Sequence, residues 1–503
     1  MHSREDIFTK EGKSFPGKTY TEVVLEPAYD EAKEHLLEPM MAINKAHLIM
    51  LYEQNLISND EVKKIAKALC SINLMELYTS NYTGEYEDLF FHIEQLLMKQ
   101  AGDIAGNLHL ARSRNDMCVT MFRMAMRQKL LQAISSALAL KKQIMAFAEE
   151  HLHTLMIAHT HTQQAQPTTL AHYMMAVGDS LTRDIRRLQQ AYQNCNRSSM
   201  GAAAITTSGF PINRDRVKEL LAFDELAENS YDAIAGADYL GEAATAIQLA
   251  AINLGRVIQD FLAWCTQEFS ILKVADPYVQ ISSIMPQKRN PVSFEHMRSI
   301  LSSCVGNTQT VLSMLHNTPY GDIVDTEDDM QPYAWRSAEI LEKIYRLFAC
   351  VVGTMEVNQE VLRQRARTSF ATVTELADTL VRTDSLSFRQ AHHIVSKVVK
   401  KAIALGISAN EIRLSLLNEA ALEVLGRSLS IDEKKLEQAL DPVYFVEIRT
   451  LPGGPSPSEI QRMIAIRRKQ YLSFSKWLDD QKNQIEQATL HMDQLLQEWS
   501  EAR

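Results

Sequence analysis

Two adjacent hydroxyls, two cations and an amide are gathered in the stretch QISSIMPQKRNPVSFEHMR, residues 280–298. Its two prolines cannot donate backbone hydrogen bonds, and each biases the residue before it away from helix, so we expect a loop. Ser282 and Ser283 are candidates for a nucleophile or a base, and Lys288 and Asn290 can hold a developing negative charge. The pattern indicates a chemical site rather than a connector that happens to be rich in Ser and Lys.

A second polar stretch, HLARSRND, covers residues 109–116 and precedes an amphipathic helical pattern. Arg112 and Arg114 can offer a fork of donors to a carboxylate, and Asn115 can add an amide donor. The alternative is a solvated, charged helix start. Asp116 is a reasonable first-turn acid and need not contact a substrate.

A third stretch, IAHTHTQQAQPTTL, covers residues 157–170. Thr160 and His161 precede a Gln-rich turn, and Pro167 is typical of the start of the next long helix. His159 and His161 could serve as two metal ligands, but no nearby thiolate or obvious acidic ligand completes a set. An acid or base role for His161 is the more economical interpretation.

Long helices must position these stretches. Residues 40–166, 212–276 and 333–441 contain no proline, and the 503 residues include only 18 glycines. Helix formers such as Ala, Leu, Met, Gln, Glu and Lys fill those windows. We therefore predict an all-α protein.

Composition excludes several classes of function. The net charge is -10 and the cations are scattered, which argues against nucleic-acid binding. The six cysteines lie far apart without a CxxC pair, so we expect reduced thiols in a cytoplasmic protein. The charged first residues and the lack of a run of about 18 apolar residues support neither secretion nor membrane insertion.

The motifs together resemble those of a known family. SSIMPQKRNP closely resembles the signature loop of the fumarase/aspartase superfamily, and HLARSRND with THTQQAQPTTL narrows the likeness to the argininosuccinate lyase family. FVEIRTLPGGPSPSEI, near the C-terminus, is similar to that family's ending. The resemblance covers roughly residues 81–460 and is more specific for the superfamily than for the substrate.

This resemblance implies a mostly helical subunit of three domains with a long central bundle. We expect an N-terminal helical domain over residues 1–110, the bundle over 111–363 and a C-terminal helical domain over 364–503. The resemblance also implies a homotetramer whose sites each take residues from three subunits, with no cofactor and no metal. The substrate would be a small dicarboxylate, an N-substituted aspartate that loses an amine reversibly to give fumarate.

The resemblance also assigns roles in the reaction. By position in the motif, Ser282 is the base that removes a proton, and Ser283 supports it. The product of that step is a doubly charged aci-carboxylate, which Lys288 and Asn290 would hold. Serine is a poor base, so the loop must stabilise its alkoxide, with Lys288 the nearest cation in the sequence.

The remaining roles concern the leaving amine and substrate binding. His161 matches the histidine that helps to protonate the leaving nitrogen, and Glu295 matches the carboxylate that pairs with it. Arg114 is expected to have a structural role. The residues that the resemblance implies as substrate contacts are Arg112, Ser113, Asn115, Thr160, Gln166, Ser283 and Tyr320.

The likeness breaks down at TPYGDIVDTEDDM, residues 318–330. Tyr320 is retained, but the Gln and Lys with which the family holds the amino-acid end of its substrate are lost or replaced by acids. Five carboxylates between residues 322 and 329 favour a more cationic leaving group, such as a diamine or a guanidine without its own carboxylate. The alternative is a solvated charged face. Ile281 also stands where the family has Gly.

The default function is therefore cleavage of argininosuccinate to arginine and fumarate, as in arginine biosynthesis. The alternatives are a paralogue that acts on another N-succinyl amine, or one that adds an amine to fumarate. A non-catalytic structural relative is disfavoured by the joint presence of Ser282, Lys288, Asn290, His161 and Glu295.

Overall fold

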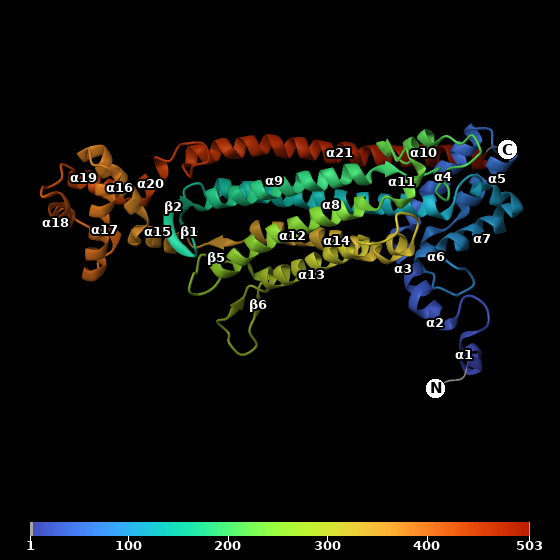
Figure 1. Cartoon of the computed structure of the whole chain (residues 1–503), viewed down its shortest axis with the longest axis horizontal. Coiled ribbons are helices and arrows are strands. Elements are labelled where there is room, and N and C mark those ends of the chain that lie inside the picture. Colours follow the sequence, from blue (N-terminus) through green and yellow to red (C-terminus); the bar gives the residue numbers. More distant parts are fainter. Residues whose placement is uncertain (1–3, 502–503) are drawn as a thin grey trace.

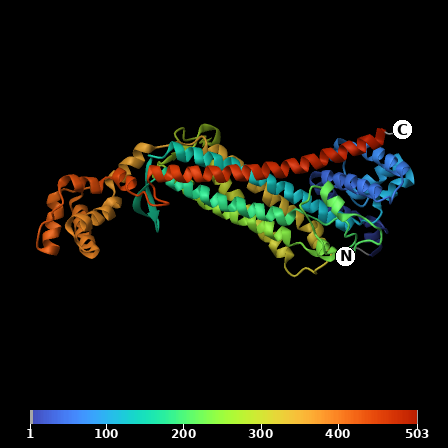
Figure 2. The same cartoon turned by 90° about the horizontal axis from the view of Figure 1, so that it is seen from above.

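The computed structural model describes residues 4–501 and shows an elongated molecule built on five long helices that run side by side (Figures 1 and 2). The longest of the five, α8, has 37 residues, which corresponds to about 55 Å of helix. The all-α prediction is confirmed. The five helices are α8 (Arg114–Glu150), α9 (Leu170–Cys195), α12 (Asp238–Trp264), α13 (Val292–Leu315) and α14 (Gln331–Val352).

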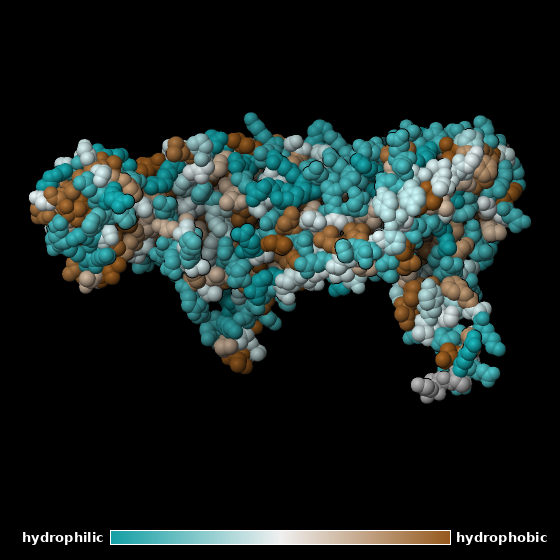
Figure 3. Space-filling view, in the orientation of Figure 1, coloured by the Kyte–Doolittle hydropathy of each residue, from teal (hydrophilic) through white to brown (hydrophobic). Residues whose placement is uncertain are grey.

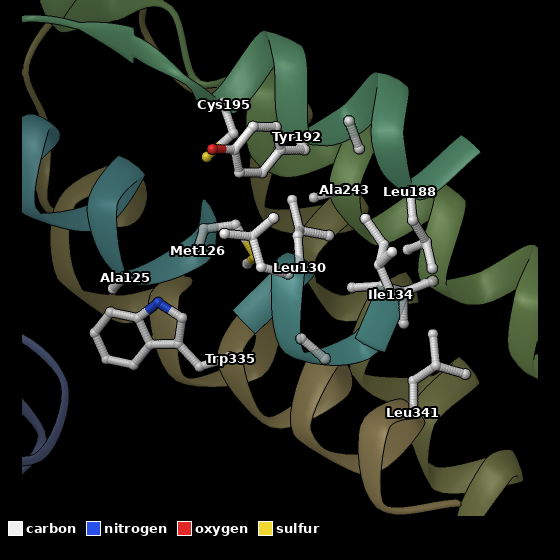
Figure 4. Packing of buried hydrophobic residues seen from close by; sticks show 14 of the residues in the cluster. Ala125, Met126, Leu130, Ile134, Leu188, Tyr192, Cys195, Ala243, Trp335 and Leu341 are labelled. Atoms are coloured by element: carbon white, nitrogen blue, oxygen red, sulfur yellow. The ribbon is translucent and has the colours of Figure 1, made fainter. Parts of the chain in front are cut away.

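Helix α8 lies inside the bundle and buries apolar side chains toward α9 and α14. Figure 4 shows Met126, Leu130 and Ile134 of α8 within this core. Their neighbours come from the other long helices and include Leu188, Tyr192, Ala243, Trp335 and Leu341. Burial of these side chains from several elements holds the long helices in fixed register.

The N-terminal helices form one end of the molecule (Figure 1). Helix α4 is largely apolar, has most of its residues buried, and packs on α5 and α8. The helices are α1 (Arg4–Glu11), α2 (Lys18–Tyr20), α3 (Glu26–His35), α4 (Leu37–Glu53), α5 (Asn59–Ser71), α6 (Leu74–Thr79) and α7 (Leu89–Ala101), with a π-helical turn at Thr21–Leu25 and a 3₁₀ segment at Gly102–His109.

A separate helical cluster forms the opposite end, and it has its own apolar core between residues 376 and 440. Its helices are α15 (Gln359–Thr368), α16 (Val373–Asp384), α17 (Phe388–Leu405), α18 (Leu414–Leu425), α19 (Glu433–Leu440) and α20 (Pro442–Glu447). Two short helices, α10 (Arg214–Leu220) and α11 (Ser230–Ala235), lie in the connection between α9 and α12.

The last helix, α21 (Pro457–Glu501), returns along the whole bundle to the N-terminal helices (Figures 1 and 2). Its buried residues Leu478, Met492 and Leu496 belong to the main core rather than to the C-terminal cluster. The boundaries at residues 110 and 363 stay a prediction, and the C-terminal segment that we predicted as one domain divides its contacts between two cores.

The strands are short and form two-stranded pairs in the described part of the chain. They are β1 (Leu155–Thr160) with β2 (Gln163–Thr169), β3 (Arg197–Ser198) with β4 (Glu225–Leu226), β5 (Leu272–Lys273) with β8 (Glu356–Val357), and β6 (Gln280–Ile281) with β7 (Arg289–Asn290). The predicted helix start at Pro167 is wrong, because Pro167 pairs with Ile157 in the β1–β2 hairpin. Helix α9 begins at Leu170, where the Thr169 hydroxyl caps it by accepting from the His172 amide at 3.1 Å.

The surface view shows a projection below the bundle with an apolar tip (Figure 3), at the place where Figure 1 labels β6. Two exposed isoleucines belong to this projection, Ile281 at 75% and Ile284 at 83% exposure. None of the helices between residues 4 and 501 has the length and apolarity needed to cross a membrane.

Candidate active site

The HLARSRND stretch forms the N-terminus of α8. Ser113 and Asp116 make a capping box, in which the Ser113 backbone amide donates to the Asp116 carboxylate at 2.9 Å and the Asp116 backbone amide donates to the Ser113 hydroxyl. The Asn115 backbone amide also donates to the Ser113 hydroxyl, at 3.3 Å. The other Asp116 oxygen accepts the amides of Gly201 and Ala203 at 2.8 and 3.1 Å. Ser113 therefore caps the helix in this structure, and Asp116 anchors the loop that follows α9.

Arg112 lies in the interior rather than in an open groove. Its side chain is 8% exposed, its Nε donates to His109 at 3.4 Å, and its Nη1 has no hydrogen-bond partner. Burial lowers the pKa of Arg112 to about 10 and that of nearby His47 to about 3. A buried guanidinium with an unused donor is suited to bind a carboxylate, as the sequence predicted, provided that the anion reaches it.

Arg114 and Asn115 point toward acidic neighbours. The Arg114 guanidinium pairs with Asp88 at 2.9 Å and with Glu87 at 3.2 Å, which supports the structural role that we expected. The Asn115 amide nitrogen donates to the carboxylate of Asp322. The segment that departs from the family therefore borders Asn115, across 207 residues of chain.

The acidic segment is partly buried and forms a π-helical turn at Asp325–Asp329. Burial and a hydrogen bond with Asp322 raise the pKa of Glu327 to about 8. Burial also raises the pKa of Asp328, with Asp329 as the next cause. The raised pKa favours the protonated form of Glu327 at neutral pH, in which its hydroxyl can donate to the Asp322 carboxylate.

Tyr320 stands beside this segment with 63% of its surface exposed. Its hydroxyl donates to Asp232 at 2.5 Å, and its ring stacks on Tyr231 with 6.1 Å between centroids. The hydrogen bond to Asp232 raises the pKa of Tyr320 to about 12. The phenol is therefore a donor near Asn115 rather than an anion.

His161 occupies the tip of the β1–β2 hairpin at the other end of α8. Thr160 pairs with Gln163, so His161 and Thr162 are the two turn residues, and both have positive φ, 50° and 63°. Two successive positive φ values are typical of a type I′ turn, which Asn and Gly adopt more easily than His and Thr. The turn presents the His161 imidazole to solvent in the isolated chain. Gln166, further along β2, donates to the Thr374 hydroxyl at 3.4 Å.

The Ser282 loop is a hairpin held by β6 and β7 at its base, where Gln280 pairs with Asn290 and Ile281 with Arg289. The Ser282 hydroxyl oxygen accepts the amides of Met285 at 3.1 Å and Ile284 at 3.4 Å. Two backbone N–H groups aimed at one oxygen form a small anion site. The loop therefore stabilises negative charge on Ser282 without help from another element.

The neighbours of Ser282 take different positions. Lys288 and Ser283 are exposed on the same hairpin, and Asn290 is half-buried at its base. Glu295 is not in the loop, because α13 begins at Val292 and places Glu295 in its first turn. The predicted loop thus ends earlier than the signature stretch does.

The sequence did not predict one contact that positions the Ser282 hairpin. The Arg289 guanidinium donates to the Val274 carbonyl at 3.2 Å and to Asp276 at 2.5 Å, so it connects the hairpin base to the segment between β5 and the 3₁₀ turn at Asp276–Tyr278. The motif places a cation at residue 289, but its partner lies 13 residues upstream in an unremarkable stretch. No sequence signal pointed to Asp276.

The three signature stretches are not brought together within one chain. Asn115 lies in the first turn of α8 and His161 lies beyond its last turn, so the 37-residue helix of about 55 Å runs between them. In the same way α13, about 36 Å long, runs between Asn290 and Tyr320. Among the described residues no ion pair joins His161 to Glu295. The single subunit therefore unites Asn115 with Tyr320 and Asp322, and it keeps the His161 and Ser282 hairpins elsewhere (Figure 1).

Comparison with known sequences identifies the family of this chain. Residues 48–306 match the lyase family, and residues 370–447 match the argininosuccinate lyase C-terminal family. Argininosuccinate lyase 2 of Agrobacterium fabrum is 42% identical over 463 residues, which cover 92% of this chain and 92% of that relative. The chain belongs to the argininosuccinate lyase family. The argininosuccinate lyase of Methanocaldococcus jannaschii is 36% identical and covers 90% of this chain and 92% of its own length.

Solved structures agree with membership of the argininosuccinate lyase family. EDDS lyase in complex with formate superposes with a TM-score of 0.87 at 29% identity over 98% of each chain. An EDDS lyase variant with bound fumarate gives 0.86 at 29% identity over 99% of each chain. A class II fumarase of Schistosoma mansoni, 17% identical with a TM-score of 0.67 over 82% of this chain and 90% of its own, shares the fold. The protein is a carbon–nitrogen lyase.

Proposed function

We propose that the protein eliminates an amine from an N-substituted aspartate to give fumarate, with cleavage of argininosuccinate to arginine and fumarate as the default reaction. Membership of the argininosuccinate lyase family supports this reaction. The observation that carries it is the Ser282 hydroxyl, which accepts two backbone amides on a projecting hairpin. A hydroxyl held in this way suits a base better than a structural contact.

In the first step, a proton is removed from the carbon next to one substrate carboxylate. That carboxylate then takes up a second negative charge. The Ser282 alkoxide takes this proton, and the amides of Ile284 and Met285 stabilise the alkoxide beforehand. The electron pair moves into the carboxylate and forms the aci-carboxylate, which Lys288 and Asn290 hold. One preorganised donor of this kind contributes about 100-fold to 1,000-fold in rate.

The second step breaks the carbon–nitrogen bond. The electron pair of the aci-carboxylate returns to form the double bond of fumarate, and the leaving nitrogen takes a proton from His161. Glu295 pairs with the imidazole and holds it in the tautomer that donates. Both groups are exposed, and no ion pair joins them within residues 4–501, so we propose that the pairing forms with a second subunit.

Substrate binding uses the α8 N-terminus. Asn115 and the unused Nη1 of Arg112 receive the carboxylates of the succinyl group. Tyr320 contacts the substrate through its exposed ring, because its hydroxyl donates to Asp232. Ser113 supports this binding through the cap that orients Asn115. The other contacts that we propose come from the two hairpins and are Thr160, Gln166 and Ser283.

We further propose a homotetramer in the cytoplasm with sites shared between subunits. Helix lengths of about 55 and 36 Å keep the signature stretches apart in one chain. The Ser282 hairpin also exposes Ile281 and Ile284, which a neighbouring subunit would cover. Apolar side chains on the bundle face, Leu249, Ile252 and Ile300, are exposed in the same way.

A second candidate function is elimination of a different, more cationic amine. Asp322 borders Asn115, and Asp232 borders Tyr320. Arg114, next to Asn115 in the chain, is already paired with two carboxylates. A leaving group with a second positive charge would suit these neighbours better than one with a free carboxylate. The likeness to EDDS lyase supports this candidate.

Fumarate absorbance separates the two candidates. The purified protein is given argininosuccinate and, in parallel, N-(2-aminoethyl)aspartate, with Ser282→Ala as the inactive control. A kcat/KM for argininosuccinate in the ordinary enzymatic range of about 10⁴ M⁻¹s⁻¹ or more supports the default reaction. Turnover of the diamine adduct alone supports the second candidate. Absence of fumarate from any N-substituted aspartate contradicts both.

A further inference from the structure

A cavity of about 530 Å³ lies between the N-terminal helices, α8 and α21, away from the signature stretches. Its α8 residues run from Met124 to Gln132, so they lie about 14 to 26 Å beyond Asn115 along the helix. Small-molecule sites of proteins have this size and join an apolar floor to a few polar groups. The floor here includes Met41, Ala42, Leu74, Met124, Ala125, Ile485 and Met492.

The cations around this cavity already have partners. Lys45 pairs with Asp493 at 2.5 Å, and Lys129 pairs with Glu339 and is 11% exposed. Only the stem of Arg127 faces the cavity, because its guanidinium donates to the Asn196 side chain and to two backbone carbonyls. No cation is therefore available for an anionic ligand.

The carboxylates on the rim are in the opposite situation. Glu34 and Glu38 are exposed at the cavity, and no ion pair joins either of them to a cation within residues 4–501. Burial raises the pKa of neighbouring Glu31, and the next causes are the charges of Glu34 and Glu339. The cavity thus carries uncompensated negative charge above an apolar floor.

An aromatic ring completes the rim. Tyr78 lines the cavity beside Glu38, with 37% of its surface exposed. Burial and the adjacent Glu38 carboxylate, to which its hydroxyl is hydrogen-bonded, raise the pKa of Tyr78. A neutral phenol ring next to a carboxylate offers a face and a counter-charge to a cation.

We propose that this cavity is a second binding site, and that its ligand is a small alkylamine or alkylguanidine. The cationic group lies between Glu34, Glu38 and the Tyr78 ring, and the alkyl part covers the methionines of the floor. A free carboxylate on the ligand is disfavoured, because Lys45 and Lys129 are already neutralised. The proposal does not depend on the reaction that the protein catalyses.

Calorimetric titration of the full-length protein with agmatine tests the proposal. Agmatine carries a guanidinium and an ammonium without a carboxylate, and arginine is the matched probe that adds one. The titration uses an Asn115→Ala background, which removes a substrate contact at the α8 N-terminus. We expect saturable binding of agmatine, weaker binding of arginine, and a decrease in affinity as ionic strength rises.

Variants locate the site. Glu34→Gln/Glu38→Gln should weaken agmatine binding about tenfold or more. Glu360→Gln/Glu437→Gln removes the same charge from the C-terminal cluster and should leave binding unchanged. Ala42→Leu fills the floor without a change of charge and should also weaken binding. An affinity for agmatine that is equal in all of these variants, or the absence of binding, would overturn the proposal, and circular dichroism verifies that each variant is folded.

Discussion

The role proposed for Ser282 as a base depends on the contacts of one atom, its hydroxyl oxygen. Its oxygen accepts the amides of residues two and three positions further along, so the arrangement is local and needs only the turn that the Met-Pro sequence enforces. Ser283, its immediate neighbour, is exposed, and the amides of Ile284 and Met285 donate to the Ser282 oxygen. The motif position assigned different roles to the two hydroxyls, and their contacts in the structure differ as well.

The inequality of the two serines can be tested by matched substitutions. Ser282→Ala should lower kcat by at least about 1,000-fold with a small change in KM, because the proton acceptor is lost. Ser283→Ala should lower kcat much less, since the hydroxyl supports binding rather than proton transfer. Initial rates of fumarate formation measure both. Equal losses in the two variants would contradict the assignment of Ser282 as the base.

Glu327 gives the stability of the protein a predictable pH dependence. Its folded-state pKa of about 8 lies above the usual 4.5, so the folded chain keeps a proton that the unfolded chain releases in this window. The stability that this carboxyl contributes is complete below pH 4.5 and is lost as pH rises through 8. Glu327→Gln should therefore flatten the fall in unfolding free energy between pH 5.5 and 8.5, as measured by urea denaturation. A slope identical to that of the wild type would argue against the raised pKa of Glu327.

At the scale of elements, two hairpins carry the proposed reacting groups Ser282 and His161, and long helices separate these hairpins from the α8 N-terminus. The sequence identified both hairpins as polar interruptions, because proline, glutamine and serine break the helical pattern there. It could not reveal that residues 163–169 form a strand, since Pro167 is compatible with either a helix start or an edge strand, and pairing with residues 155–160 decided between them. The Ser113 cap was also hidden, because a hydroxyl at this position suits a substrate contact equally well.

The Arg289–Asp276 ion pair should act as one unit at the base of the Ser282 hairpin. Arg289→Gln and Asp276→Asn should each lower kcat by about 10-fold to 100-fold, because a misplaced base loses alignment with its proton. The double variant should lose little more than either single variant, which a double-mutant cycle on kcat/KM measures. Fully additive losses would mean that the two side chains act separately.

At the scale of the whole molecule, the sequence did not predict how far apart the three signature stretches lie in one chain. Local patterns report which residues interrupt helices, whereas the placement of those interruptions follows from helix lengths and from contacts hundreds of residues apart. The structure shows that one subunit holds Asn115, Tyr320 and Asp322 together and holds His161 and Ser282 at a distance. This separation is the reason for our proposal that a complete site takes residues from further copies of the chain.

Subunit sharing predicts complementation between inactive variants. Asn115→Ala and Ser282→Ala should each be inactive alone, and a mixture that is dissociated and reassembled should regain part of the activity, since some sites then receive both intact residues. Light scattering should give about 228 kDa, the mass of four 57.0 kDa chains. A 57.0 kDa monomer with full activity would refute the shared site.

The return of α21 along the bundle bears on how the protein is made. Lys45 and Asp493 form an ion pair across 448 residues, and α21 packs against α5 and α4 near the start of the chain. During translation the N-terminal helices emerge first, but the helix that covers them leaves the ribosome last. The apolar surface of these N-terminal helices stays exposed to solvent until α21 has been synthesised. Nascent chains of this protein should therefore depend on chaperones, and truncation before residue 457 should produce aggregates.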